Sequence, residues 1–389
     1  MRPLRIAIAS AGRFHVLDLA RELHALGHDV AFYSYVPRRR TAAFGLPAAC
    51  HRSLLPFAAP VLAADRLAFG AAADIREWAM MKSLNFGLMR VLEPCDLFIG
   101  MSGIYLEAAR HARRRFGAAV WLERSSVHIL AQDEILKAAP GAARPSAFAI
   151  SRELAGYDLA DRIVVPSRVV AESFRREPRL LPKLFRTPLG VDIEMFKPVR
   201  RTMTRSETML VFVGAWSVRK GCDLLSAAIA GIDNVRLIHV GPLADAAFPA
   251  GRRFVHVDPV PQAKLPDYFA MADASLLFSR EDGFGIVLAQ ALACDLPIIC
   301  SDRTGGADLA HTPALAERII VVPNGDVAAL QAAIVGLRER LAAQGPSPLL
   351  PAADRDTLSW AAYGRRYAAA IDAAFAAGGT SRDPGRHVA

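Results

Sequence analysis

The stretch of residues 275–306 constrains the fold of this chain more than any other part of the sequence. Two short apolar runs, at 276–278 and 297–300, enclose a polar loop that contains glycine and about ten residues with helical spacing. This order is typical of a strand, a loop, a helix and a second strand. Such units build parallel sheets covered by helices, so the sequence predicts an α/β protein.

The loop of this unit has the features of an anion site. Gly283 and Gly285 flank Phe284 and would let the backbone approach a ligand closely. The helix that follows directs its unpaired N–H groups and positive dipole end toward the loop, which suits a phosphate. Asp282 and Gln290 are eight positions apart and would lie about two turns from each other on roughly the same side. A buried unit with ordinary loop glycines explains these residues equally well.

Length and composition predict two domains and exclude several classes of protein. The 389 residues, 53% of them hydrophobic, suffice for two cores at about 100–200 residues per domain. No run of about 18 uncharged apolar residues occurs and no signal-peptide pattern opens the chain, so we expect a cytoplasmic protein. The five cysteines form no Cys-x-x-Cys pair and are interpreted as reduced core residues, not as metal ligands or disulfides.

The first half of the chain carries the whole net charge of +9. Residues 1–199 contain 28 Lys and Arg against 19 Asp and Glu, whereas residues 200–389 contain 19 of each. Arginine clusters at 38–40 and 113–115 could face anionic lipid head groups or a phosphorylated acceptor, although a solvated surface also accounts for them. No DNA-binding motif is visible, so nucleic acid is not an expected partner.

The first half opens like a doubly wound sheet. A buried-strand pattern at 5–9 is followed by a loop that contains Gly12, a helix-period segment at 14–26 and a second apolar run at 30–35. The Gly-x-Gly-x-x-Gly fingerprint is absent from this first loop. This absence argues against an oxidoreductase that uses a nicotinamide or flavin dinucleotide.

A later strand pattern, at 118–122, is followed directly by polar residues. Arg124 and His128 would stand just beyond its carboxyl end, where ligands bind in open α/β sheets. A satisfied structural histidine and a functional one are about equally expected at such a place.

A second α/β domain follows a charged linker at 200–205. Its first strand pattern ends in Gly214, and the next loop carries Arg219 and Lys220 before a helix begins. A strand, a basic loop containing glycine and a helix start form a second candidate anion site, now flanked by two cations.

Several short motifs stand in order along the chain. They are Leu189-Gly190-Val191-Asp192 with Phe196 and Pro198, Val213-Gly214 with Arg219-Lys220-Gly221, Asp282-Gly283-Phe284-Gly285, the segment Gln290-Ala291-Leu292-Ala293-Cys294 with Leu296-Pro297, and Gly305-Gly306. Each is weak alone, but in this order and at these intervals they resemble the retaining family-4 glycosyltransferases of the GT-B fold, also called glycosyl transferases group 1. The resemblance extends from about residue 5 to residue 375.

The resemblance implies two Rossmann-like, doubly wound domains that face each other across a cleft. The N-terminal acceptor domain would span 1–198 and the C-terminal donor domain 206–357. A C-terminal helix at about 358–376 would cross back to the first domain, and 377–389 would form a disordered tail.

The implied reaction is transfer of a sugar from a UDP- or GDP-sugar to an acceptor hydroxyl with retained anomeric configuration, in cell-envelope or exopolysaccharide glycan assembly. The basic first domain favours a lipid-linked glycan acceptor and a peripheral position at the inner face of the cytoplasmic membrane. The diphosphate leaving group builds negative charge that fixed cations and amides can neutralise, so no metal ion or other cofactor is expected.

The resemblance also assigns residues. The expected catalytic group is Lys220, Arg219, Asp282 and His128. The expected donor-binding group is Gly214, Gly283, Phe284, Gly285, Ile286 and Gln290. The expected acceptor or reaction-centre group is Gly12, His15 and Arg124.

Two departures from the family pattern keep other functions open. Asp282 and Gln290 stand where the family has two glutamates. The aspartate shortens the reach toward the sugar by one methylene, and the glutamine keeps a carbonyl for the ribose but loses the charge. A GT-B nucleotide-sugar epimerase and an inactive relative that only binds a nucleotide or a partner enzyme are the alternatives.

Overall fold

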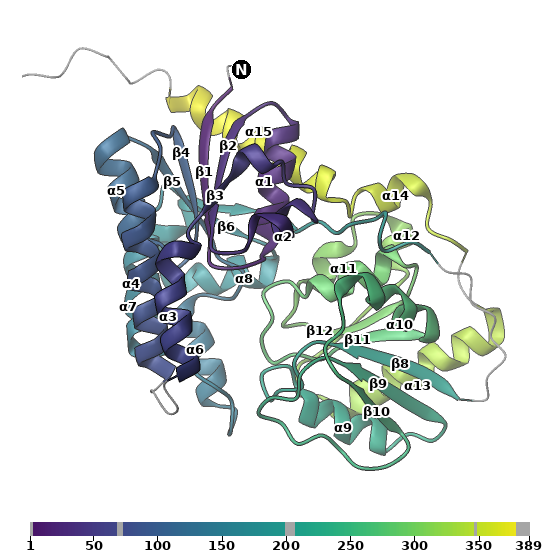
Figure 1. Ribbon diagram of the computed structural model, residues 1–389. Coiled ribbons are helices and arrows are strands. Elements are labelled where there is room, and N and C mark those ends of the chain that lie inside the picture. Colours follow the sequence, from purple (N-terminus) through teal and green to yellow (C-terminus); the bar gives the residue numbers. More distant parts are fainter. Residues whose placement is uncertain (1–2, 68–72, 199–206, 346–347, 379–389) are drawn as a thin grey trace, which may run out of the picture. The chain divides into compact units, whose positions relative to one another are not determined.

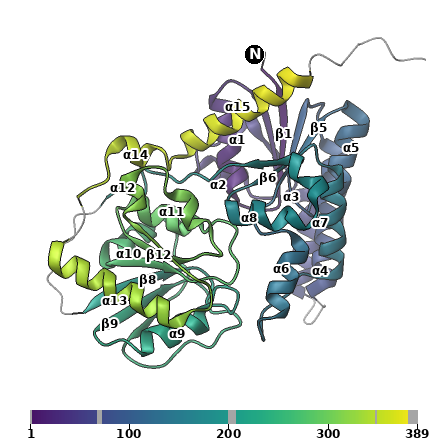
Figure 2. The ribbon, with the colours of Figure 1, turned by 180° about the vertical axis from the view of Figure 1, so that it is seen from behind.

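The computed structural model describes residues 3–67, 73–198, 207–345 and 348–378, and Figures 1 and 2 show it from two sides. The chain divides into two compact units. Residues 1–123, 155–163 and 360–389 make the first unit, and residues 124–154 and 164–359 make the second. The predicted linker at 200–205 and residues 379–389 of the predicted tail lie outside the described residues.

A seven-stranded sheet has the order β3-β2-β1-β4-β5-β6-β7. Its strands are β1 (Arg5–Ser10), β2 (Asp29–Ser34), β3 (His51–Ser53), β4 (Leu97–Met101), β5 (Ala119–Glu123), β6 (Arg162–Val165) and β7 (Leu184–Arg186). Strand β1 pairs in parallel with β2 on one side and with β4 on the other. All five residues of β4 are buried, which means that both faces of the sheet are covered. Strands buried on both faces have continuous apolar sequences, as this half of the chain does.

Helices connect and cover these strands. They are α1 (His15–Ala25), α2 (Arg38–Ala42), α3 (Leu55–Leu67), α4 (Ala73–Val91), α5 (Leu106–Phe116), α6 (Ile129–Lys137), α7 (Ala147–Leu159) and α8 (Arg168–Ser173), with 3₁₀ turns η1 (Ala48–Cys50), η2 (Phe174–Arg176) and η3 (Pro178–Lys183). Helix α1 lies within the predicted segment 14–26 and is followed by Gly27 at a φ of 93°, a left-handed conformation that commonly follows a helix end.

The C-terminal helix α15 (Trp360–Gly378) packs against the first unit, where Figure 1 shows it in yellow beside α1. A Cβ atom on Gly364 would come within 2.4 Å of Glu22 Cβ, so the two helix backbones approach closely. The ring of Tyr367 lies 5.4 Å from the ring of Trp121 on β5. The predicted return of the C-terminal helix to the N-terminal sheet is therefore confirmed. Residues 377 and 378, predicted as the start of the tail, are the last two positions of this helix.

A six-stranded sheet in the second unit has the order β10-β9-β8-β11-β12-β13. Its strands are β8 (Thr208–Val213), β9 (Val235–Val240), β10 (Phe254–Val257), β11 (Ala274–Leu277), β12 (Ile298–Ser301) and β13 (Ile319–Val322). The helices of this part are α9 (Cys222–Ala230), α10 (Leu265–Met271), α11 (Ile286–Ala293), α12 (Pro313–Ala316), α13 (Val327–Gln344) and α14 (Ala352–Asp356), with 3₁₀ turns η4 (Gln262–Lys264) and η5 (Gly305–Leu309).

The predicted fold class, with two doubly wound parallel sheets, is confirmed. In each sheet the first strand in sequence lies between the second and the fourth, so the direction of winding reverses beside it. These switch points lie between β1 and β4 and between β8 and β11. Ligands of open α/β sheets bind at the carboxyl ends of the strands that flank such a point. Among the described helices, none combines the length and the apolar character needed to cross a bilayer.

Candidate functional site

The candidate site lies at the switch point of the second sheet. The loop after β8 and the loop after β11 leave two paired strands at their carboxyl ends. The first loop runs from Gly214 to Gly221 and carries Lys220, and the second carries Asp282. Lys220 Nζ forms an ion pair with Asp282 Oδ2. Asp282 Oδ1 accepts a hydrogen bond from Gly285 N at 3.2 Å, so the lysine of one predicted anion site lies beside the glycine loop of the other.

The two loops approach so closely that Gly221 leaves no room for a side chain. Its backbone is left-handed, at a φ of 68°, and a Cβ atom there would lie 2.1 Å from the carbonyl oxygen of Phe278, the residue after β11. The glycine therefore lets the loop that carries Lys220 pack closely against the loop that carries Asp282.

Asp282 is held in its ionised form. Burial acts to raise the pKa of its carboxyl group, but the Lys220 ammonium and the Arg219 guanidinium outweigh burial, and the pKa is lowered. An ionised carboxylate only accepts hydrogen bonds. In this site it accepts from Lys220 and from the Gly285 amide, and the same oxygens suit the hydroxyl groups of a ligand.

A second carboxylate, Glu281, pairs with the other predicted cation. Arg219 Nε donates to Glu281 Oε2 at 2.8 Å, and the glutamate is fully buried. Its carboxylate also accepts from Val127 N and from Gln132 Nε2, each at 3.2 Å. The sequence motifs assigned no role to Glu281. The available signal was two adjacent carboxylates opposite two adjacent cations, but only their tertiary partners show which carboxylate is buried and which meets the lysine.

The glycine loop is fixed by contacts with residues from earlier in the chain. A Cβ atom on Gly283 would lie 1.7 Å from the carbonyl oxygen of Ser125, so only glycine fits between them. Ser167 Oγ donates to the carbonyl oxygen of Gly283 at 2.6 Å. Gly285, at a φ of 74°, is the N-cap of α11, and Ile286 is the first residue of that helix. Phe284 lies between the glycines with 2% of its surface exposed.

Gln290 lies in the second turn of α11 and is buried. Among the residues that the structure describes, its Oε1 atom has no hydrogen-bond partner. A buried acceptor without a partner costs about 1–3 kcal/mol, so this oxygen is available to a hydrogen-bond donor from a ligand or from water. The role of Gln290 at the donor stays a prediction.

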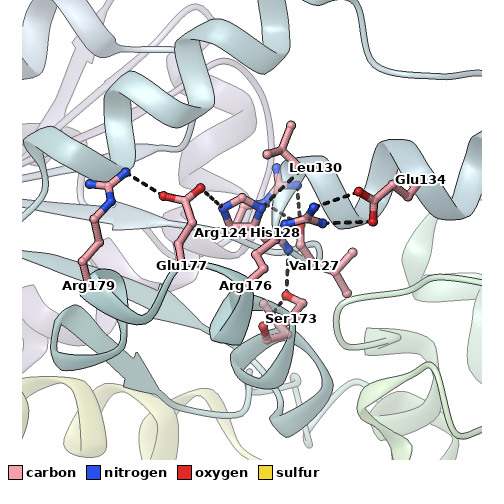
Figure 3. Close-up of polar contacts among 10 residues, drawn as sticks. Arg124, Val127, His128, Leu130, Glu134, Ser173, Arg176, Glu177 and Arg179 are labelled. Carbon is pink, nitrogen blue, oxygen red and sulfur yellow. Dashed lines mark hydrogen bonds and ion pairs between the residues drawn. The ribbon is translucent and has the colours of Figure 1, made fainter.

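The structure places Arg124 and His128 in a buried polar network (Figure 3). Arg124 pairs with Glu153 at 2.8 Å and donates to Gln132 Oε1 at 2.9 Å. Because Gln132 donates in turn to Glu281, Arg124 joins the same network as Arg219. These contacts give Arg124 a part in supporting the site.

His128 is the N-cap of α6, since its Nδ1 atom accepts from Leu130 N at 3.3 Å. Its Nε2 atom lies 3.1 Å from Glu177 Oε1 (Figure 3). Its ring meets the Phe174 ring edge to face at a centroid distance of 4.9 Å. Burial is the main cause that lowers the pKa of His128 to about 4, although Glu177 acts to raise it. His128 is therefore neutral near pH 7 and fully buried in the structural network.

Two of the predicted residues, Gly12 and His15, belong to the first unit. Gly12 lies in the loop after β1, where its carbonyl oxygen accepts from Ser10 Oγ at 2.7 Å. His15 is the first residue of α1, and its Nε2 atom lies 2.8 Å from Glu123 Oε2. Glu123 also accepts from Tyr367 Oη at 2.7 Å and is thus held between two elements. Glu123 was not among the residues predicted for the site.

Within the described ranges, no three or more His, Cys, Asp and Glu side chains are grouped so that they could hold a metal ion. The polar groups at the switch point of the second sheet are instead arranged as two pairs of opposite charge, Lys220 with Asp282 and Arg219 with Glu281. Each cation sits beside a carboxylate that an incoming anion would have to displace or share.

The part of the chain that holds this site matches a family model. Residues 207–340 match the family model described as glycosyl transferases group 1, and this range contains the whole second sheet with both loops. Over 178 residues the chain is 30% identical to the D-inositol 3-phosphate glycosyltransferase of Segniliparus rotundus. The aligned residues make up 39% of this chain and 39% of that protein. The chain thus matches well under half of the length of this relative.

Solved structures agree with the fold. Sucrose-phosphate synthase from Thermosynechococcus elongatus superposes on this chain with a TM-score of 0.70 at 20% sequence identity. The superposition covers 96% of this chain and 100% of the synthase chain. HepE of Anabaena in complex with UDP-glucose superposes with a TM-score of 0.65 at 13% sequence identity. This superposition covers 95% of this chain and 100% of the HepE chain. At these identities the likeness concerns the fold.

Proposed function

Residues 207–340 belong to the glycosyl transferases group 1, as the motifs predicted, and from this premise we propose that the protein transfers a sugar from a nucleoside-diphosphate sugar to an acceptor hydroxyl. The proposal rests on one observation at the switch point of the second sheet. There the Asp282 carboxylate pairs with Lys220 and accepts a hydrogen bond from the Gly285 amide. A cation, a carboxylate and a helix start within one hydrogen-bonded group suit a ligand that joins a diphosphate to a polyhydroxylated ring.

The cations are the groups that would act on the diphosphate. As the bond from the sugar to the diphosphate breaks, negative charge develops on the departing phosphate, and fixed cations stabilise that charge most where it is largest. Lys220 and Arg219 would supply this charge. Asp282 and Glu281 hold both cations in the site, and an incoming diphosphate would share the cations with these carboxylates or displace the carboxylates.

The carboxylate and the glutamine are the groups that would orient the donor. Asp282 is ionised and would accept hydrogen bonds from the hydroxyl groups of the sugar. Gln290 offers a buried oxygen to the ribose. HepE of Anabaena forms a complex with UDP-glucose, which supports a uridine nucleotide as the donor; a guanosine nucleotide is the other candidate.

We further propose that the anomeric configuration is retained and that no metal ion is needed. Lys220 and Arg219 can do the work that a divalent cation does for diphosphates elsewhere. Nuclear magnetic resonance of the first-formed product reports its anomeric configuration, and an inverted product would contradict the retaining mechanism. A product formed without any acceptor would indicate the epimerase instead.

The first test of the function is binding. Isothermal titration calorimetry with UDP-glucose and with GDP-mannose should show that the wild type binds one of the two. The Lys220→Ala variant should bind that nucleotide sugar at least tenfold more weakly. The matched control is Lys264→Ala, which removes an exposed lysine of η4 in the same unit and should leave affinity unchanged. Equal affinities for all three proteins, or no binding by the wild type, would refute the proposal.

We propose a lipid-linked glycan acceptor, in cell-envelope or exopolysaccharide assembly at the inner face of the cytoplasmic membrane. On the first unit, α4 exposes Ile75, Trp78 and Phe86, with 60%, 50% and 51% of their surfaces accessible. Lys82 and Arg90 are exposed on the same helix, and the Arg90 guanidinium lies 4.8 Å from the centre of the Phe86 ring. Aromatic and cationic side chains together favour an anionic lipid surface.

Flotation with vesicles tests this location. The protein should float with vesicles that contain anionic lipid, and salt should weaken the association. Trp78→Ser should reduce it, whereas Trp360→Phe, which alters a buried tryptophan in the same unit, should not. Failure to float with anionic vesicles at low salt would contradict the proposed location and leave the sugar transfer to be judged by the binding test.

A further inference from the structure

Two histidines of the second sheet form a hydrogen-bonded chain that ends in the first loop of the candidate site. His239 on β9 and His256 on β10 are direct partners in the parallel ladder, and Phe212 on β8 is the partner of His239. The Nδ1 atoms of the two imidazoles are 3.0 Å apart. His239 Nε2 lies 2.8 Å from the carbonyl oxygen of Gly214, and His256 Nε2 lies 3.4 Å from Asp258 Oδ1.

Aromatic side chains bury the His239 end of this chain. His239 and Trp216 are fully buried, and their rings are 5.0 Å apart. Phe248 lies over both histidines, at 5.8 Å from His239 and 5.4 Å from His256. The planes of the two imidazoles differ by 24° at a centroid distance of 5.0 Å. The rings are thus nearly parallel, and their Nδ1 atoms, 3.0 Å apart, are within hydrogen-bonding distance.

The partners determine where the protons lie. A carbonyl oxygen only accepts, so His239 must carry a proton on Nε2. Burial lowers the pKa of His239, which keeps it neutral near pH 7 and leaves Nδ1 as an acceptor. His256 must then donate from its own Nδ1. The His256 ring is 25% exposed, and its Nε2 atom faces Asp258.

We propose that His239 and His256 are positioning residues that hold the carbonyl of Gly214, and with it the loop that carries Lys220, in the form that binds the donor. The proposal rests on the sugar-transfer function. Gly214 is pinned from its other side as well, because its N–H donates to the carbonyl of Val240 at 3.0 Å. The hydrogen bond from His239 therefore fixes the orientation of the Gly214 carbonyl, at the start of the loop.

The chain breaks when His239 gains a proton on Nδ1. Two Nδ1–H groups then face each other, and a positive charge lies in an aromatic enclosure. In the described part of the chain, Asp258 is the one carboxylate that forms an ion pair with either ring. Asp258 is 94% exposed and compensates little of that charge. Donor affinity should therefore fall as the pH drops below the lowered pKa of His239.

The proton positions can be observed without any ligand. Long-range proton–nitrogen spectra of the full chain, labelled with nitrogen-15 histidine, distinguish the two neutral forms of each imidazole, and the substitutions His239→Gln and His256→Asn assign the signals. At pH 7.5 His239 should carry its proton on Nε2 and His256 on Nδ1. A proton on Nδ1 of His239 at that pH would overturn the inference.

The role in binding is tested with UDP-glucose and GDP-mannose at pH 7.5 and 5.0. A diphosphate esterified at both ends keeps its charge over this range, unlike a terminal phosphate, whose second pKa is about 6. Affinity of the wild type should fall once the pH is below the lowered pKa of His239, by about threefold to tenfold, the worth of one neutral hydrogen bond. The glutamine of His239→Gln keeps a hydrogen-bond donor and an acceptor but does not titrate. Its affinity for the nucleotide sugar should therefore equal that of the wild type at pH 7.5 and should not change with pH. The affinity of His239→Leu should be reduced at both pH values.

The control is His24→Gln, which removes an exposed histidine of α1 and should keep the wild-type pH profile. A wild type that binds a nucleotide sugar while His239→Leu binds it equally well would refute the positioning role alone. A wild type that binds neither nucleotide sugar would refute the proposed function, and the positioning role with it.

Discussion

The replacement of Glu281 by glutamine tests how the site is held together. The carboxylate accepts three hydrogen bonds, from Val127 N, Gln132 Nε2 and Arg219 Nε. In Glu281→Gln the remaining oxygen can keep the bond from Val127, but the new amide group faces two donors and can accept from neither. Removing one partner of a buried ion pair costs about 3–5 kcal/mol. Arg219 keeps 34% of its side chain in contact with solvent and is partly rehydrated, so we expect the lower end, about 3 kcal/mol.

The free energy of unfolding is measured by urea titration followed by tryptophan fluorescence, since Trp216 is fully buried in the same unit. The matched control is Glu172→Gln, which alters a glutamate 3.9 Å from Arg168 at the surface, with side chains 47% and 67% exposed. An exposed pair of this kind contributes about 0.5 kcal/mol or less. If Glu281→Gln lost no more than that control, Glu281 would not be the residue that anchors Arg219, and the buried ion pair would not be what holds the two loops together.

Four further predictions concern the same unit. Lys220→Ala should cost roughly 2–4 kcal/mol of transition-state stabilisation, measured as the ratio of kcat/KM values, and normal turnover would exclude its proposed role. Gly221→Ala should lower the melting temperature and weaken nucleotide-sugar binding, because the new Cβ atom would lie 2.1 Å from a carbonyl oxygen in a left-handed backbone; wild-type values for both would contradict that contact. His128 has a folded pKa of about 4, below the ordinary 6.5, so its share of stability is complete above pH 6.5 and is lost progressively as the pH falls toward 4, to a limit of about 3 kcal/mol. His128→Asn keeps an acceptor for the cap of α6 and should flatten that part of the pH profile of the unfolding free energy. Activity should survive EDTA, and its loss with recovery only on addition of a divalent cation would show that the two cations do not suffice.

Local sequence determined the architecture because the fold class depends on patterns within short stretches. Continuous apolar runs predict strands that are buried on both faces, as at 5–9 and in the run that ends in Gly214. Glycines that end strands and cap helices, such as Gly214 and Gly285, also have a local conformational cause. The two loops of the candidate site could be placed at the ends of strands for the same reason.

The tertiary structure decided the partners, because a side chain's role depends on residues that are distant in sequence. Glu281 and Asp282 are neighbours with the same chemistry, yet one is fully buried on Arg219 and the other binds Lys220. His128 stands at the carboxyl end of a strand, as predicted, but the structure uses it as a buried helix cap. His239 and His256 are 17 positions apart and gave no signal in the sequence. Their contact exists because two parallel strands pair in one register, and register is a property of the assembled sheet.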